Sequence, residues 1–283
     1  MLEMLLNPRS SERHPWELFF IGIVYASVSI LLVTWVFAND AVLSKYSGIL
    51  IVTFTVMLSM PSLYSIIKRE EQKEERISDS YRLIKEHGHI IYSFLWLFVG
   101  LLVAFSFWYI VLGSTDNYKA QIETYCAINS PNSYETCVME YTIQTKTTGF
   151  VTGANMLGGI FANNLYVLIF TIFFSLIFGA GGIFILAWNA SVISGAMVIF
   201  AKSNIYALPL SLARYMIHGL PEIAAYFTGT LAGGIIGLSI MRKEFKTDKF
   251  WSIMHDSLML IIISIGLLVF AAIIEVFVTP VLF

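Results

Sequence analysis

The chain has 283 residues, of which 57% are hydrophobic and only 13% are charged, and its formal net charge is −2. Six long runs contain no Lys or Arg, and each is about 20 residues or longer, enough for a helix to cross about 30 Å of hydrocarbon. A soluble domain would not leave such runs uncharged, and the net charge gives no indication of nucleic-acid binding. We therefore predict an all-α, polytopic helical membrane protein with a single membrane domain over 1–283.

The apolar runs predict seven membrane spans. The first begins at Leu18 and is followed by Asn39 and Asp40 rather than by a small-residue cleavage pattern, which indicates a membrane helix and not a cleaved signal peptide. Pro61 is expected to kink the second span. The predicted spans are 18–38, 46–67, 90–112, 165–187, 188–201, 220–241 and 258–278.

The run over 165–201 is too long for one span and needs a break. Gly179, Gly181, Gly182 and Asn189 are the candidates for it. We predict a helical hairpin that turns near Trp188–Asn189, with Asn189 and Gly195 as its turn residues. A re-entrant pair of helices is the alternative, since broken helices are tolerated where protein buries them.

The distribution of Lys and Arg predicts the orientation. With the N-terminus inside, the inner segments hold twelve of these residues and the outer segments hold five, as the positive-inside rule requires. The C-terminus is then outside. The charged inner loop 68–89 mixes both signs at helical spacings, which favours a solvated helix, either as a spacer or as a docking helix for a cytoplasmic partner.

The largest outer loop, 113–162, contains both cysteines. Two cysteines on the outer side predict one disulfide between Cys126 and Cys137, worth about 3 kcal/mol on the chain-entropy model. Free thiols or a metal pair are the alternatives, and two ligands alone make a poor metal site.

The stretch 213–237 carries ionisable residues inside an apolar run. Pro221 suits the first turn of a helix, so span six is expected to begin near Leu220, with Glu222 in its first turn. Ala225, Gly229, Gly233 and Gly237 repeat every four positions, a pattern that lets another helix approach closely. Glu222 falls on the same face and should point toward protein rather than lipid.

Other polar residues are expected at the same end of the bundle. The predicted cluster consists of Asn163, Asn164, Arg214, His218, Glu222 and Glu275. Ionisable groups at such depth are expensive and usually paired. The cluster is interpreted as a hydrogen-bond network that pins helix ends, with a metal or proton site and partner docking as alternatives. No second His stands at metal spacing and no complete catalytic set is present, so we assign no metal, cofactor or catalytic residue.

Three ordered motifs resemble the stage II sporulation protein M family over about 150–237. They are Asn163-Asn164 at the start of a membrane helix, a Gly-rich stretch leading to Asn189 and Gly195, and His218-Gly219 with Glu222 at the start of the next helix. Ala190 stands where the family pattern has Gly. The resemblance implies a multi-span membrane protein. In spore formers the family member is a scaffold that helps peptidoglycan-degrading enzymes, and relatives occur in organisms without spores.

Together these features predict a non-enzymatic scaffold or assembly protein of the cell membrane. It would sit in the lipid bilayer and contact itself or other membrane proteins through glycine-rich helix faces. The alternatives are a transporter or permease-like subunit that works with a separate ATPase, and an intramembrane metal-dependent enzyme that uses His218, Glu222 and Glu275.

Overall fold

The computed structural model describes residues 15–37, 40, 42–74, 80–112, 116–129, 134–143, 153–179, 181–203, 206, 208–242 and 247–282. Its helical elements are α3 (Glu17–Val36), η1 (Leu43–Tyr46), α4 (Ser47–Glu74), α5 (Ser80–Leu112), η2 (Asp116–Tyr118), α6 (Lys119–Asn129), α7 (Tyr134–Ile143), α8 (Gly153–Phe178), α9 (Ile183–Ser203), α10 (Leu208–Met241), α11 (Asp248–Ile273), η5 (Ile274–Val278) and α12 (Thr279–Leu282). No strand occurs among these residues, so the predicted all-α class is confirmed.

Six of these helices are long and apolar enough to cross a membrane. They supply the spans Glu17–Val36, Leu43–Arg69, His87–Leu112, Leu157–Phe178, Leu212–Met241 and Phe250–Leu282, and α9 adds the shorter apolar segment Ile183–Met197. Pro61 lies inside α4. The chain is thus a polytopic helical membrane protein.

The break in the long run lies at the glycines, and the predicted turn at Asn189 and Gly195 is wrong. α8 ends at Phe178 and α9 begins at Ile183, while Gly179 has a φ of 69°, which glycine adopts most readily. Asn189 and Gly195 both lie inside α9. The Asn189 amide donates to the carbonyl oxygen of Ile185 at 2.8 Å, so the helix itself satisfies this side chain and no turn is needed.

Spans four and six begin earlier than predicted. The fourth span starts at Leu157 rather than at 165, and the sixth starts at Leu212 rather than at 220. Pro221 therefore stands inside α10 and not in its first turn. An interior proline removes one helical N–H, a loss that membrane helices tolerate when neighbouring helices surround the site.

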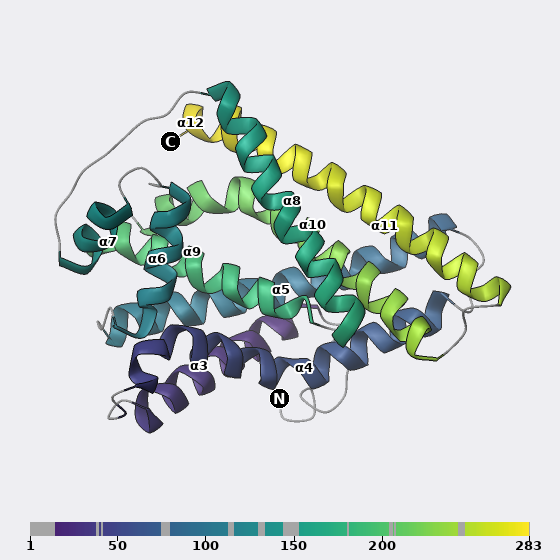
Figure 1. Ribbon diagram of the computed structural model, residues 1–283, viewed down its shortest axis with the longest axis horizontal. Coiled ribbons are helices and arrows are strands. Elements are labelled where there is room, and N and C mark those ends of the chain that lie inside the picture. The colour runs from purple at the N-terminus through teal and green to yellow at the C-terminus, as the bar shows by residue number, and fades with distance from the viewer. Residues whose placement is uncertain are drawn as a thin grey trace.

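Two parallel helix pairs organise the bundle. α3 runs parallel to α5, since Phe19 packs on Trp96 and, further along both helices, the Trp108 Nε1–H donates to Ser27 Oγ. Between these contacts a Cβ on Gly100 would meet the backbone of Phe19, and a Cβ on Gly22 would meet the backbone of Leu97. α8 packs along α10 in the same manner, and α9 lies against α4, α5 and α10. In Figure 1, α8 crosses the molecule from the end with α12 and α7 to the opposite end, and α11 runs along the same side of the bundle.

The two short helices between α5 and α8 form a small unit at one end, called here the α6–α7 end (Figure 1). A disulfide joins Cys126 on α6 to Cys137 on α7, as the sequence predicts. Both cysteines are buried, and α6 packs against α9.

Near the same end, Asp40 Oδ1 accepts the backbone N–H groups of Leu43 (2.7 Å) and Val42 (2.9 Å), and these bonds hold the pKa of Asp40 below its usual value.

Some of the residues on which predictions depend lie outside the described part of the chain. They include 1–14, 75–79 in the charged inner loop, and 113–115, 130–133 and 144–152 in the outer loop. Within the inner loop, α4 continues to Glu74 and α5 begins at Ser80. The orientation in the membrane stays a prediction.

Thiol labelling of intact cells tests the orientation. Val42 lies between α3 and η1, Ser252 lies near the start of α11, and both are exposed. We expect a membrane-impermeant maleimide to label Val42→Cys without permeabilisation and Ser252→Cys only after it, because the positive-inside bias places the connection after the first span outside and the segment before the last span inside. The reverse labelling pattern would invert the assignment.

Candidate functional site

α10 is the central helix of the bundle, and its glycine ladder contacts α8 of the same chain. Of its membrane-spanning window, 89% is buried, against 22% for α8. A Cβ on Gly229 would meet the Leu168 side chain, and a Cβ on Gly233 or Gly237 would meet the carbonyl oxygen of Ile172 or Leu176. Each step of four residues along α10 thus matches a step of four along α8, which identifies the two helices as parallel.

The ladder is therefore filled by an internal helix and does not present a free surface to a partner. Ala225 is fully buried as well. If the same register is continued one turn toward the N-termini of both helices, Ala225 lies opposite Asn164, whose side chain is buried. Small residues let the two backbones approach closely, and this approach is what the four-residue spacing provides.

Polar side chains gather where α10 passes η5 and α12. The Tyr226 hydroxyl donates to Glu222 Oε1 at 2.7 Å. Thr279 Oγ1 lies 3.3 Å from His218 Nδ1 and also donates to the carbonyl oxygen of Ile274 at 3.2 Å. Glu275 lies in η5, one turn before Thr279, and η5 packs against α10. The printed contacts thus join His218 to α12, which follows η5 and Glu275, and join Glu222 to Tyr226 of its own helix.

The other three predicted residues stand at the margin of this cluster. Arg214 is exposed and is close enough to act electrostatically on His218. In the α8–α10 contact, Asn164 lies opposite Ala225, about one helical turn from Glu222, and its side chain is buried. Asn163 is exposed on another side of α8. The Asn163 amide donates to Asn164 Oδ1 at 3.3 Å.

Sequence reasoning missed Tyr226 and Thr279. Each follows a glutamate of the cluster by four residues, on the same side of its helix, and this spacing is the signal that indicates them. Among the residues that the structure describes, no three His, Cys, Asp or Glu side chains gather in an arrangement that could hold a metal ion. What the cluster offers chemically is two carboxyl groups, a phenol and an imidazole in nonpolar surroundings.

A second polar contact, which the sequence did not indicate, ties α6 to the bundle. Gln121 is 1% exposed, and its amide donates to the Gly48 carbonyl oxygen at 3.0 Å and to Ser191 Oγ at 3.3 Å. Tyr109 donates to the Ser191 carbonyl oxygen at 3.2 Å, and its ring packs against Tyr118. Burial raises the pKa of Tyr118. Residues from five elements meet here.

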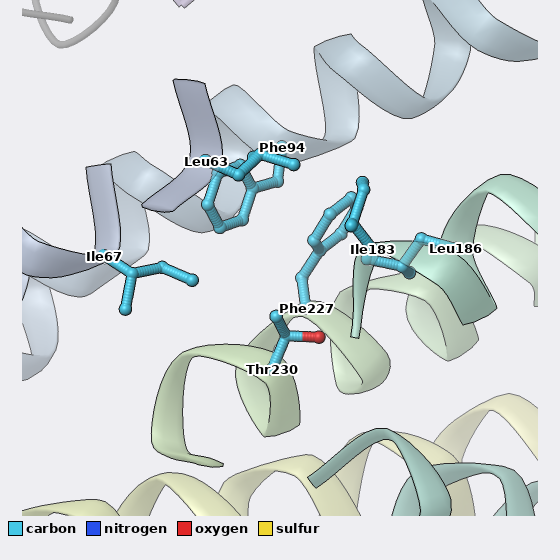
Figure 2. A pocket seen from close by; sticks show the side chains of 7 residues that line it. All are labelled: Leu63, Ile67, Phe94, Ile183, Leu186, Phe227 and Thr230. Carbon is cyan, nitrogen blue, oxygen red and sulfur yellow. The ribbon is translucent and has the colours of Figure 1, made fainter. Parts of the chain in front are cut away.

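A hollow lies between α4, α5, α9 and α10, as Figure 2 shows. Its lining is apolar except for one hydroxyl: Leu63, Ile67, Phe94, Ile183, Leu186, Phe227 and Thr230. The hydroxyl of Thr230 donates to the Tyr226 carbonyl oxygen of its own helix at 2.9 Å. The hollow has no room for a water-sized molecule, so we read it as a packing seam and not as a binding site.

Comparison with known proteins identifies one family. The model of the family described as "Stage II sporulation protein M" matches residues 18–280, nearly the whole chain. No curated protein and no solved structure gives a significant match.

Proposed function

This chain belongs to the stage II sporulation protein M family, and we propose that it is an integral membrane assembly protein that binds a second copy of itself through α8. The proposal rests on one face of α8 near the α6–α7 end. Gly159, Ala162, Asn163 and Tyr166 follow one another at helical spacing on the side that faces away from α10, and all four are exposed. This set is called the α8 face below.

The α8 face has the features of a helix contact without a neighbour from the described chain. Apart from its chain neighbours and the nearby backbone of its own helix, no described atom lies within 4 Å of the position of a Cβ on Gly159. Asn163 stands about 22 Å before the end of α8 at 1.5 Å per residue, which is well inside a membrane span. A polar amide that faces lipid at this depth is unfavourable, and hydrogen bonds between membrane helices relieve it.

A second copy suits this face because an amide side chain is self-complementary. Asn163 uses one amide hydrogen within the chain and has a further hydrogen and a carbonyl oxygen to offer. Across a two-fold axis, each Asn163 can donate to the other, and the small residues beside it allow the two helices to approach. An isologous α8–α8 contact follows.

Cross-linking tests this contact. We expect Ala162→Cys to form a covalent dimer in membranes under a mild oxidant, and Gly159→Leu in that background to abolish it by keeping the two helices apart. Asn163→Leu should weaken the dimer by about 1–2 kcal/mol. Gly266 on α11 is the matched control, since a Cβ there also has open space.

Gly266→Cys should give no dimer, and Gly266→Leu should leave the Ala162→Cys dimer intact. An Ala162→Cys protein that folds and stays monomeric on oxidation would contradict self-assembly through α8. Equal loss of the dimer with both leucine substitutions would also contradict it, because the effect would then not belong to the α8 face.

A further inference from the structure

Tyr166 exposes a phenol in the middle of a membrane span. Its side chain is 73% exposed, and its hydroxyl has no hydrogen-bond partner among the residues that the structure describes. The span runs from Leu157 to Phe178, so Tyr166 stands about 13 Å from one end and about 18 Å from the other at 1.5 Å per residue. Exposed tyrosines of membrane proteins gather at the membrane–water interfaces, where the hydroxyl is wet. Tyr166 lies too deep for either interface.

The side of α8 that carries Tyr166 is open along the whole span. Only 22% of the α8 window is buried within the protein, against 33% or more for each of the other five candidate spans. Exposed side chains follow one another there at alternate steps of four and three residues: Gly159, Asn163, Tyr166, Phe170, Phe173 and Ile177. This average step of about 3.5 is the repeat of helices that pack side by side with a crossing angle of about 20°.

The membrane fixes how two copies can meet on this face. Both copies insert with the same orientation, because both carry the same distribution of charges. A two-fold axis that relates them therefore runs along the membrane normal, and the two α8 helices are parallel and in register. In such a pair each side chain contacts the same layer and the adjacent layers of the other helix. Asn163 and Tyr166 occupy adjacent layers, so Tyr166 of each copy comes within reach of Asn163 of the other.

The Asn163 amide has room for exactly such a donor. One of its hydrogens bonds to Asn164 Oδ1 within the chain, and the other can bond to Asn163 Oδ1 of the second copy. Each Oδ1 has two lone pairs, and this amide contact uses one of them. A phenol hydroxyl suits the remaining lone pair. With Tyr166 included, every donor and acceptor of the Asn163 side chain has a partner within the nonpolar layer.

We propose that Tyr166 makes the α8 face specific for a second copy of this chain, by donating its hydroxyl hydrogen to Asn163 Oδ1 of that copy. This inference rests on the proposed self-assembly through α8. An apolar helix from another protein would leave the phenol and the amide without partners, which is unfavourable in nonpolar surroundings. The apolar side chains beyond Tyr166 supply contact area, and the polar layer supplies the choice of partner.

Tyr166→Phe tests the hydrogen bond, since it removes the hydroxyl and keeps the ring. We expect the Kd of the dimer to rise about tenfold, because the two-fold axis makes this change remove two hydrogen bonds between membrane helices. Energy transfer between donor- and acceptor-labelled copies of the full-length protein, attached at Val42→Cys and diluted with lipid in liposomes, measures the Kd. Tyr92→Phe is the matched control, because Tyr92 is also exposed but lies on α5, and it should leave the Kd unchanged.

A double-mutant cycle identifies the acceptor of the hydroxyl hydrogen. In the Asn163→Leu background, Tyr166→Phe should have no further effect, because the acceptor is already absent. If Tyr166→Phe dimerises like the unchanged protein, if its effect adds to that of Asn163→Leu, or if Tyr92→Phe raises the Kd equally, the role of Tyr166 is overturned while the α8 contact stands. If the unchanged protein shows no energy transfer at any dilution, the α8 contact is overturned and this inference with it.

Discussion

Replacing Gly237 with leucine is expected to lower the stability of the bundle by about 3 kcal/mol, the upper part of the usual range for overpacking. A Cβ at this position would meet the carbonyl oxygen, carbonyl carbon and Cα of Leu176 on α8. These are backbone atoms, so no side chain can rotate aside to make room. α8 and α10 would have to move apart along their whole contact.

Thermal unfolding in mild detergent, followed by size-exclusion chromatography of the heated samples, measures this effect. Gly266→Leu is the matched control, because the same side chain there enters open space on α11. The melting temperature of Gly237→Ala should lie between those of Gly237→Leu and Gly266→Leu, since this change adds the clashing Cβ without the rest of the leucine side chain. A Gly237→Leu protein that melts with the control would show that α8 and α10 do not touch at Leu176.

The membrane class of the chain could be predicted from composition alone, and the site could be predicted only in part. Hydrocarbon thickness sets a minimum length for an apolar helix, so uncharged runs reveal spans without any knowledge of packing. The limits of those spans are less certain, since polar residues such as Asn163 and His218 are tolerated inside long membrane helices. This is why spans four and six begin earlier than expected.

The position of the turn between α8 and α9 could not be predicted, for a different reason. Asn and Gly are both common in turns, and 165–201 contains several of each. Gly179 makes the turn because its backbone adopts a positive φ. Asn189 instead bonds to the helix in which it lies, a local alternative that the sequence does not distinguish from a turn.

Long-range contacts could not be predicted from the sequence. The four-residue spacing of Gly229, Gly233 and Gly237 indicated a closely packed helix but not that this helix is α8. Gly22 and Gly100 are single glycines without a repeat, and only the fold shows that each meets the backbone of the other helix. Gln121 belongs to a segment that reads as a loop, and the elements that it joins are far apart in sequence.

Gln121→Leu is expected to be the most damaging single change in the α6–α7 unit. The leucine has a similar volume but cannot donate, so the buried carbonyl oxygen of Gly48 and the Ser191 hydroxyl each lose a partner. The Ser191 hydroxyl keeps its bond to the Trp188 carbonyl oxygen, so the cost is that of two lost hydrogen bonds, about 0.5–1.5 kcal/mol each. Because the Cys126–Cys137 disulfide holds α6 to α7 but not to the bundle, both helices should detach together.

Amide hydrogen exchange of the intact protein distinguishes this outcome from general unfolding. We expect faster exchange over α6 and α7 in Gln121→Leu, while the exchange of α8 and α10 stays as in the unchanged protein. Thr124→Ala is the control, since Thr124 lies on the same helix and its hydroxyl bonds only to the Ala120 carbonyl oxygen one turn back. Equal exchange in the two variants would mean that apolar packing on α9, and not the Gln121 amide, holds the unit in place.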